Sequence, residues 1–211
     1  MNTTGSVLLV VDVQRDFLPG GALAVPHGNE VVGVINGLVP RYEVVLATQD
    51  WHPPDHCSFA ANHPSHVPGE VIEFGGVSQI LWPVHCVQGS PGADFAPGLK
   101  VDRFRKIFHK GIDPAVDSYS AFFDNARRRS TGLGEYLKGQ NLADVHVCGL
   151  ATDYCVVWSV LDALDLGFKV TLIRDACRGI DLQPGDSERA LAKAASAGAR
   201  LTTSGELGYA E

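Results

Sequence analysis

The stretch DVHVCGLATDYCVVWSVLDALDLG, residues 144–167, decides the fold of this chain. Val145, Val147 and Cys148 are small or β-branched and apolar, which predicts a buried strand, and Gly149 follows where the backbone must turn. Polar residues then recur every three positions among valines and leucines, which predicts an amphipathic helix that ends at Gly167. The polar positions are Ser159, Asp162 and Asp165.

Cys155 lies near the start of this helix. We expect Thr152 or Asp153 to be the N-cap, which places Cys155 in the first turn. Free N–H groups and the positive end of the helix dipole favour a thiolate over a thiol, so they lower a cysteine pKa from about 8.5. Cys155 is therefore a candidate nucleophile. From this stretch alone, an inert core cysteine among Val and Trp is an equally good interpretation.

Length and composition favour a single domain, residues 1–211, because 211 residues with 45% hydrophobic content can bury a sizeable core. The net charge is -7, and the one basic cluster, residues 127–129, is expected in a solvated loop or at a helix end. Such a chain carries no electrostatic footprint for nucleic acid or an anionic membrane. The first residues contain neither a basic region nor a long apolar run, so we expect a cytoplasmic protein.

The five cysteines are odd in number and none are spaced as C-x-x-C. This pattern argues against a disulfide framework or a structural zinc knuckle, and it leaves thiols free for chemistry.

Apolar runs alternate with amphipathic segments along the whole chain, which predicts an α/β fold. We expect a three-layer αβα arrangement, with a mostly parallel six-stranded sheet, helices on both faces and right-handed crossovers. The expected strands are residues 7–11, 44–47, 105–109, 145–148, 169–173 and 200–202, and the expected helices are residues 29–39, 133–138, 153–166 and 187–197.

Reactive side chains follow three of these strands. Asp12 comes directly after the apolar run 7–11, Lys110 follows the strand at 105–109, and Cys155 follows the turn after a third strand. The carboxyl ends of parallel strands meet at one edge of a sheet, so we expect the three to act together. Asp12 can accept the thiol proton and return it to a leaving amine, Lys110 favours the carboxylate and the thiolate, and Cys155 attacks. N–H groups of the turn 149–155 can form an oxyanion hole. This set suits acyl transfer on a small amide.

A second set of residues suits a metal ion. Asp50 and His52 follow the strand at 44–47, and His85 lies in the irregular segment 53–100, which is too long to be a simple linker. The mixed oxygen and nitrogen donors can hold zinc, iron(II) or manganese, and ligand type alone does not choose among them. A single histidine is more often an ordinary hydrogen-bonded residue, but the D-x-H spacing at a strand end strengthens the metal interpretation.

Several motifs occur in the order found in one known family. The chain resembles the isochorismatase-like cysteine hydrolases and, within them, the nicotinamidases. The two metal segments and the stretch DSYSAF, residues 117–122, carry the more specific resemblance. The matching stretches are residues 11–17, 48–53, 81–88, 108–111, 117–122, 149–155 and 175–179.

The resemblance implies roles for these residues. Asp12, Lys110 and Cys155 would be the catalytic triad, and Asp50, His52 and His85 the ligands of one divalent ion. His56 matches a position that binds metal in some members and not in others. The resemblance also implies a cis peptide between residues 150 and 151 and an oxyanion hole made by the amides of Ala151 and Cys155. The implied walls of an aromatic slot for a pyridine ring are Phe17, Leu23, Trp82 and Tyr119.

The implied activity is hydrolysis of nicotinamide to nicotinate and ammonia through a cysteine thioester, with the metal ion anchoring the pyridine nitrogen and pyrazinamide as a side substrate. One alternative is a hydrolase of the same family acting on another small amide or a vinyl ether. Another is a metal-binding interaction module that has lost catalysis, which the complete triad disfavours. The expected partner is a small substrate, with homo-oligomerisation left open.

Overall fold

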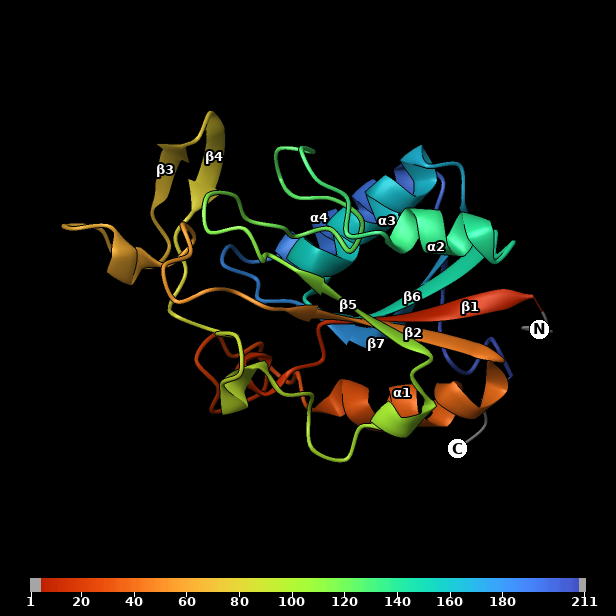
Figure 1. Cartoon of the computed structure of the whole chain (residues 1–211). Coiled ribbons are helices and arrows are strands. Elements are labelled where there is room, and N and C mark those ends of the chain that lie inside the picture. The colour runs from red at the N-terminus through yellow and green to blue at the C-terminus, as the bar shows by residue number, and fades with distance from the viewer. Residues whose placement is uncertain (1–4, 209–211) are drawn as a thin grey trace.

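A six-stranded parallel sheet forms the centre of the computed structural model, which describes residues 5–208 (Figure 1). The strand order is β5-β2-β1-β6-β7-β8, and every neighbouring pair is parallel. This confirms the predicted sheet. The strands are β1 (Ser6–Val11), β2 (Val44–Asp50), β5 (Lys106–Lys110), β6 (Asp144–Leu150), β7 (Lys169–Arg178) and β8 (Arg200–Thr202).

Helices cover both faces of the sheet, as the αβα prediction requires. From β1 the chain moves to β2 in one direction, whereas β5 to β6, β6 to β7 and β7 to β8 run in the other. Right-handed crossovers therefore place α1 on one face and the remaining helices on the opposite face (Figure 1). The helices are α1 (Glu30–Leu38), α2 (Leu133–Gly139), α3 (Val157–Asp165) and α4 (Asp186–Ser196). No helix within residues 5–208 is long and apolar enough to span a membrane.

The point where the strand order reverses its direction determines where the candidate site lies. Strands β1 and β6 are neighbours, with Val11 paired to Gly149, and their crossovers leave on opposite faces. A crevice therefore opens beyond their carboxyl ends, where ligands bind in open α/β sheets. Residues 7–11 are fully buried, which explains their unbroken apolar run.

Two elements extend further than predicted. Strand β2 continues through Thr48, Gln49 and Asp50, all three buried and paired with residues 108–110 of β5. Strand β7 continues to Arg178. Polar residues at the end of a strand still form the hydrogen bonds of the sheet, because their buried backbone groups need partners. A strand predicted from its apolar residues alone therefore ends too early at such positions.

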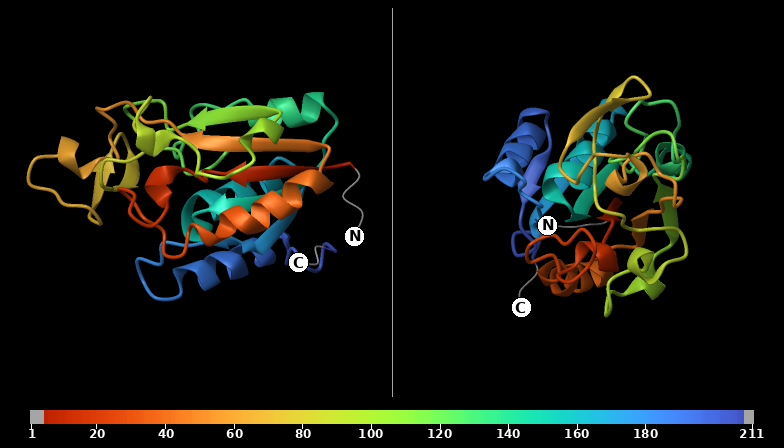
Figure 2. Two further views of the ribbon diagram at one scale, coloured as in Figure 1. Left: turned by 90° about the horizontal axis from the view of Figure 1, so that it is seen from below. Right: turned by 90° about the vertical axis from the view of Figure 1, so that its left-hand side faces the viewer.

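The segment 53–100 was expected to be irregular throughout, and this is wrong in one part. It contains an antiparallel hairpin, β3 (Val71–Phe74) and β4 (Val77–Ile80), joined by Gly75-Gly76. Figure 2 shows that the hairpin lies beyond the carboxyl edge of the main sheet. The Gly-Gly pair was an available turn signal, but the flanking residues are mostly exposed and do not form a clear apolar pattern.

The start of α3 differs from the predicted cap. Cys155 does lie in the first turn, but that turn is π-helical, Thr152–Val156, and it follows Ala151 without a side-chain cap. The Asp153 carboxylate instead accepts hydrogen bonds from the amides of Ile180 and Asp181, at 3.0 and 2.7 Å.

The polar positions of α3 are not a simple solvated face. Ser159 and Asp162 are buried, whereas Trp158 is 42% exposed. The loop 117–131 covers these positions, because the Ala121 amide donates to Ser159 Oγ at 2.8 Å and Arg127 pairs with Asp162 at 2.8 Å.

Gly149 allows β6 to approach β1. Its φ is +123°, and a Cβ there would lie 2.1 Å from the Val11 carbonyl oxygen, a backbone atom inside the sheet. We expect Gly149→Ala to lower the free energy of unfolding by about 3 kcal/mol, measured by chemical denaturation. Gly33→Ala is the matched control: Gly33 is exposed in α1 with no atom near its Cβ position, so alanine should stabilise by about 0.5–1 kcal/mol. Equal stability of Gly149→Ala and the wild type would contradict this account of the close approach.

Candidate active site

The structure brings Asp12, Lys110 and Cys155 together at the carboxyl edge of the sheet. Asp12 follows β1, Lys110 ends β5 and Cys155 lies in the turn after β6. Lys110 Nζ is 2.9 Å from Asp12 Oδ2 and 3.4 Å from Cys155 Sγ. A carboxylate oxygen of Asp12 and the Cys155 sulfur lie within 4.8 Å of each other. The spatial grouping expected from three strand ends is therefore present, and the catalytic roles remain predictions.

Residues that the sequence analysis did not assign hold this trio in place. Thr48 Oγ1 donates to Asp12 Oδ1 at 2.6 Å, and Lys110 Nζ donates to the Ser118 carbonyl at 2.7 Å and to Asp50 Oδ1 at 2.5 Å. Thr48 and Ser118 both lie in the quoted motifs, but nothing in the sequence indicated which atoms they would contact.

Burial sets the protonation of this trio. Desolvation raises the pKa of Asp12 to about 6, although the Lys110 ammonium opposes the rise. Burial also raises the pKa of the Cys155 thiol well above its ordinary value, again against the effect of Lys110. Burial alone would lower the pKa of Lys110, but Asp12 and Asp50 outweigh it and keep the ammonium charged. The predicted lowering of the Cys155 pKa is therefore wrong in direction: the resting thiol is neutral, and Asp12 is the neighbouring base.

Asp50, His52 and His85 converge as the predicted metal set, with their ligand atoms within 4.8 Å of one another. Asp50 Oδ2 lies 3.7 Å from His52 Nε2 and 3.9 Å from His85 Nε2. His52 Nδ1 donates to the Gly111 carbonyl at 2.9 Å, and His85 Nδ1 donates to the Pro83 carbonyl at 2.8 Å. These bonds leave the Nε2 lone pairs directed at the shared centre, as metal-binding histidines require.

Two further observations show that this set fits a divalent ion. His52 Nε2 is buried without a hydrogen-bond partner. Burial would raise the pKa of Asp50, but Lys110 and His52 outweigh it and hold that pKa well below its usual range. The buried carboxylates of Asp12 and Asp50 thus share one buried ammonium, and a dication would offset the remaining negative charge.

His56 is placed differently from the other histidines. One of its ring nitrogens lies within 4.8 Å of ligand atoms of His52 and Asp117, and His56 is not part of the Asp50, His52 and His85 group. The rings of His52 and His56 stack with centroids 4.1 Å apart. His56 therefore contacts His52 but does not join the predicted metal set.

All four predicted slot residues, Phe17, Leu23, Trp82 and Tyr119, line one pocket. Asp50, His85, Ala151 and Cys155 line the same pocket, so the nucleophile and the metal set open into one space. Trp82 Nε1 donates to the Tyr119 hydroxyl at 3.2 Å, which ties two walls together. The pocket also includes lining residues that the sequence analysis missed, namely Asp117, Tyr154 and Ile180.

Sequence signals existed for two of the missed residues. Asp117 opens the DSYSAF stretch and Tyr154 directly precedes Cys155, whereas Ile180 follows its motif without any chemical signature. The peptide between Leu150 and Ala151 is cis, as the resemblance implied. The donation of the Ala151 and Cys155 amides to an oxyanion stays a prediction.

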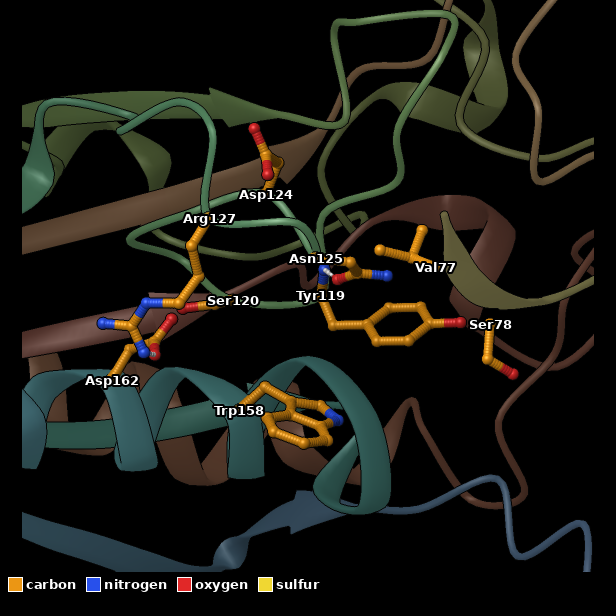
Figure 3. Close-up of a pocket in the computed structure, with 9 residues that line it drawn as sticks. All are labelled: Val77, Ser78, Tyr119, Ser120, Asp124, Asn125, Arg127, Trp158 and Asp162. Carbon is orange, nitrogen blue, oxygen red and sulfur yellow. Dashed lines mark hydrogen bonds and ion pairs between the residues drawn. The ribbon is translucent and has the colours of Figure 1, made fainter. Parts of the chain in front are cut away.

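Tyr119 also lines a second cavity, which Figure 3 shows. Its walls include Trp158 and Asn125, and the Tyr119 amide donates to Asn125 Oδ1 at 2.9 Å. Arg127 lies at the opposite end, paired with Asp162. The arginine cluster 127–129 thus lies in an exposed loop, as predicted, with its side chains bonded to nearby acceptors.

Comparison with known proteins agrees with this fold. The sequence model of the isochorismatase domain matches residues 6–206. The chain belongs to the isochorismatase family. Within this family it is 50% identical over 202 residues to the nicotinamidase of Escherichia coli, covering 93% of each chain.

Solved structures of isochorismatase-family proteins superpose well. A nicotinamidase/pyrazinamidase of Acinetobacter baumannii matches with a TM-score of 0.93 and 46% identity, over 96% of this chain and 98% of that one. The pyrazinamidase of Pyrococcus horikoshii, solved in complex with zinc, matches with a TM-score of 0.76 and 38% identity, over 94% of this chain and 99% of that one.

The predicted metal set can be tested by measuring metal content, without an activity assay. We expect His52→Ala to lose its divalent ion, because this substitution removes a buried ligand whose orientation is fixed by Gly111. Elemental analysis of protein purified without chelators measures the loss. His66→Ala, at a partly exposed histidine paired with Glu70, should keep the wild-type metal content. Wild-type protein without stoichiometric metal would contradict the assignment.

Proposed function

We propose that this protein is a nicotinamidase that hydrolyses nicotinamide to nicotinate and ammonia, with pyrazinamide as a side substrate. One observation carries the proposal: a single aromatic pocket is lined both by Cys155 and by Asp50 and His85 of the metal set. A flat ring in this pocket would present one edge to the metal set and its carboxamide to the nucleophile. The names of the similar proteins from E. coli and A. baumannii support this substrate class.

Asp50, His52 and His85 would hold one divalent ion, and zinc or iron(II) suits their donors better than a hard ion, with manganese third. The zinc complex of the P. horikoshii relative supports zinc. When bound, the ion would supply a Lewis-acid contact for the pyridine nitrogen. The protein's own residues then fix the ring between Phe17, Trp82 and Tyr119 and exclude water from the buried thiol.

Acylation begins with the neutral thiol of Cys155. Asp12 takes the thiol proton as the sulfur attacks the amide carbonyl, and Lys110 stabilises the negative charges of both groups. The amides of Ala151 and Cys155 would donate to the oxygen of the tetrahedral adduct. Asp12 then returns the proton to the leaving nitrogen, ammonia departs, and a thioester links nicotinoyl to Cys155.

Deacylation uses the same residues in reverse. Asp12 takes a proton from water as the water oxygen attacks the thioester carbonyl. The adduct collapses to nicotinate, and Cys155 regains its proton. A pKa of about 6 suits Asp12 to this double role, because it is ionised at neutral pH and its protonated form is a competent acid.

Cys155→Ala tests covalent catalysis. We expect turnover to fall by at least about 10⁴-fold, because Cys155 carries the only thiol among the described residues that line the pocket. Steady-state ammonia release measures the loss. Circular dichroism and metal content should match the wild type, since Cys155 belongs to neither the sheet nor the metal set. Retained turnover in a correctly folded variant would refute the thioester route.

Benzamide tests the contact with the ring nitrogen. It carries the same carboxamide but no pyridine nitrogen, so its kcat/KM should be lower by on the order of a hundredfold, equivalent to a few kcal/mol of transition-state binding. Pyrazinamide, which keeps a nitrogen at the corresponding ring position, is the matched control and should react. Comparable values for benzamide and nicotinamide would assign the metal set a structural or water-activating role instead.

A substrate panel tests the function itself. Product release from nicotinamide, pyrazinamide, isochorismate and carbamoylsarcosine separates a nicotinamidase from other hydrolases of the family. Preference for either of the last two would favour the alternative activity, and absence of turnover on all four would favour a binding role.

A further inference from the structure

We infer that Ser159 is a positioning residue for the nucleophile: its hydroxyl fixes the backbone of Cys155 against the loop that binds Lys110. The inference rests on the proposed roles of Cys155 and Lys110, and not on the identity of the substrate. Ser159 lies one turn after Cys155 in α3 and is fully buried. A buried hydroxyl needs hydrogen-bond partners, and those of Ser159 lie in two segments far apart in the chain.

The Ser159 hydroxyl makes two hydrogen bonds at once. Its Oγ donates to the Cys155 carbonyl at 2.5 Å, four residues earlier, and accepts from the Ala121 amide at 2.8 Å, 38 residues earlier. A hydroxyl has one proton and two lone pairs, so neither bond excludes the other. Cys155 and Ala121 are themselves buried. The hydroxyl therefore joins the backbone of the nucleophile to the loop 117–123 inside the protein.

The turn that carries Cys155 is not a regular helical turn. Residues Thr152–Val156 form a π-helical turn in which the Val156 amide donates to the Ala151 carbonyl at 3.0 Å, and no side chain caps it. Turns of this kind are rare and often occur at functional sites. A serine that donates to the carbonyl four residues earlier tends to bend a helix. Ser159 thus contributes to the angle at which this turn meets α3.

The other partner of Ser159 belongs to the loop that holds Lys110. The Ser118 carbonyl of this loop accepts a hydrogen bond from Lys110 Nζ at 2.7 Å, and Ala121 lies three residues further along. A closed path therefore runs from Cys155 through Ser159 and the loop to Lys110, whose Nζ lies 3.4 Å from the Cys155 sulfur.

The closing contact between ammonium and sulfur is the step at which position affects chemistry. Lys110 stabilises the charge that develops on the sulfur, and this attraction weakens with distance and with the entry of water. Without the Ser159 hydroxyl, the buried Ala121 amide would lose its acceptor, so the loop would shift or admit water. The ammonium and the thiol would then no longer be held at one distance, and the thiol would react more slowly.

Two pairs of side chains isolate the hydroxyl of Ser159. Wild type and Ser159→Ala form one pair, and Ser159→Thr and Ser159→Val, which have similar shapes, form the other. The readout is the rate at which iodoacetamide alkylates Cys155 at a fixed pH, followed by mass spectrometry of the Cys155 peptide. In each pair we expect the variant without a hydroxyl to react about tenfold more slowly. Ser204→Ala removes a buried hydroxyl that donates to Asp175 outside the pocket, and it should react at the wild-type rate.

Ammonia release from nicotinamide gives a second readout. In Ser159→Ala, kcat should fall by about tenfold while KM changes by less than about threefold, because Ser159 does not line the pocket. Alkylation of Ser159→Ala within about twofold of the wild-type rate, or equal slowing in Ser159→Thr and Ser159→Val, would overturn the inference.

Alkylation requires no substrate, so the two proposals fail separately. A protein that does not hydrolyse nicotinamide but shows the hydroxyl-dependent alkylation rate would refute the proposed function and support the role of Ser159. Circular dichroism of each variant identifies misfolding, and either pair decides the question if a member of the other does not fold.

Discussion

The buried ammonium of Lys110 is the interaction on which the site depends. A lysine that is only 1% exposed would normally lose its charge, but the carboxylates of Asp12 and Asp50 both pair with its ammonium, at 2.9 and 2.5 Å. Each carboxylate is also buried and needs the same cation. Removing any one of the three side chains would leave an uncompensated charge in the core, so each of them stabilises the buried charges of the other two.

This charge cluster joins the nucleophile to the metal set. One oxygen of Asp50 accepts from Lys110, and the other faces His52 and His85. Lys110 in turn donates to Cys155. The position of Asp50 is set by its backbone as well: the Gln14 side chain donates to the Asp50 carbonyl and accepts from its amide, both at 2.8 Å. Gln14 thus extends the ladder between β1 and β2 beyond the end of β1, so a shift of either strand would move the metal set and the triad together.

Burial and charge act in opposition at the nucleophile. The helix start and Lys110 favour a thiolate, yet desolvation is stronger, and Cys155 rests as a thiol. Desolvation likewise raises the pKa of Asp12 to about 6, which makes it a base of useful strength. A closed, dry pocket therefore does not require a preformed thiolate. It requires a carboxylate within reach of the thiol and a fixed cation that stabilises the charge as it moves from one group to the other.

The sequence by itself determined the layout of this protein. Continuous apolar runs such as residues 7–11 identified the parallel sheet, because strands buried on both faces carry no polar alternation. The strand-end positions of Asp12, Asp50 and Lys110 identified the edge that holds the site, because all parallel strands end there. The motif resemblance added the aromatic walls, which spacing alone did not connect to the site.

Only the tertiary structure decided the electrostatics and the contacts between distant segments. The pKa of Cys155 depends on how completely burial desolvates the thiol, and no local sequence pattern encodes that burial. The separation of His56 from Asp50 and His85 depends on how the segment 53–100 packs against the loop that carries Asp117. The burial of Ser159 and Asp162 on α3 depends on the loop 117–131. Local propensity and periodicity report which residues share a strand or a helix face, whereas burial and charge coupling arise only when segments far apart in the chain come into contact.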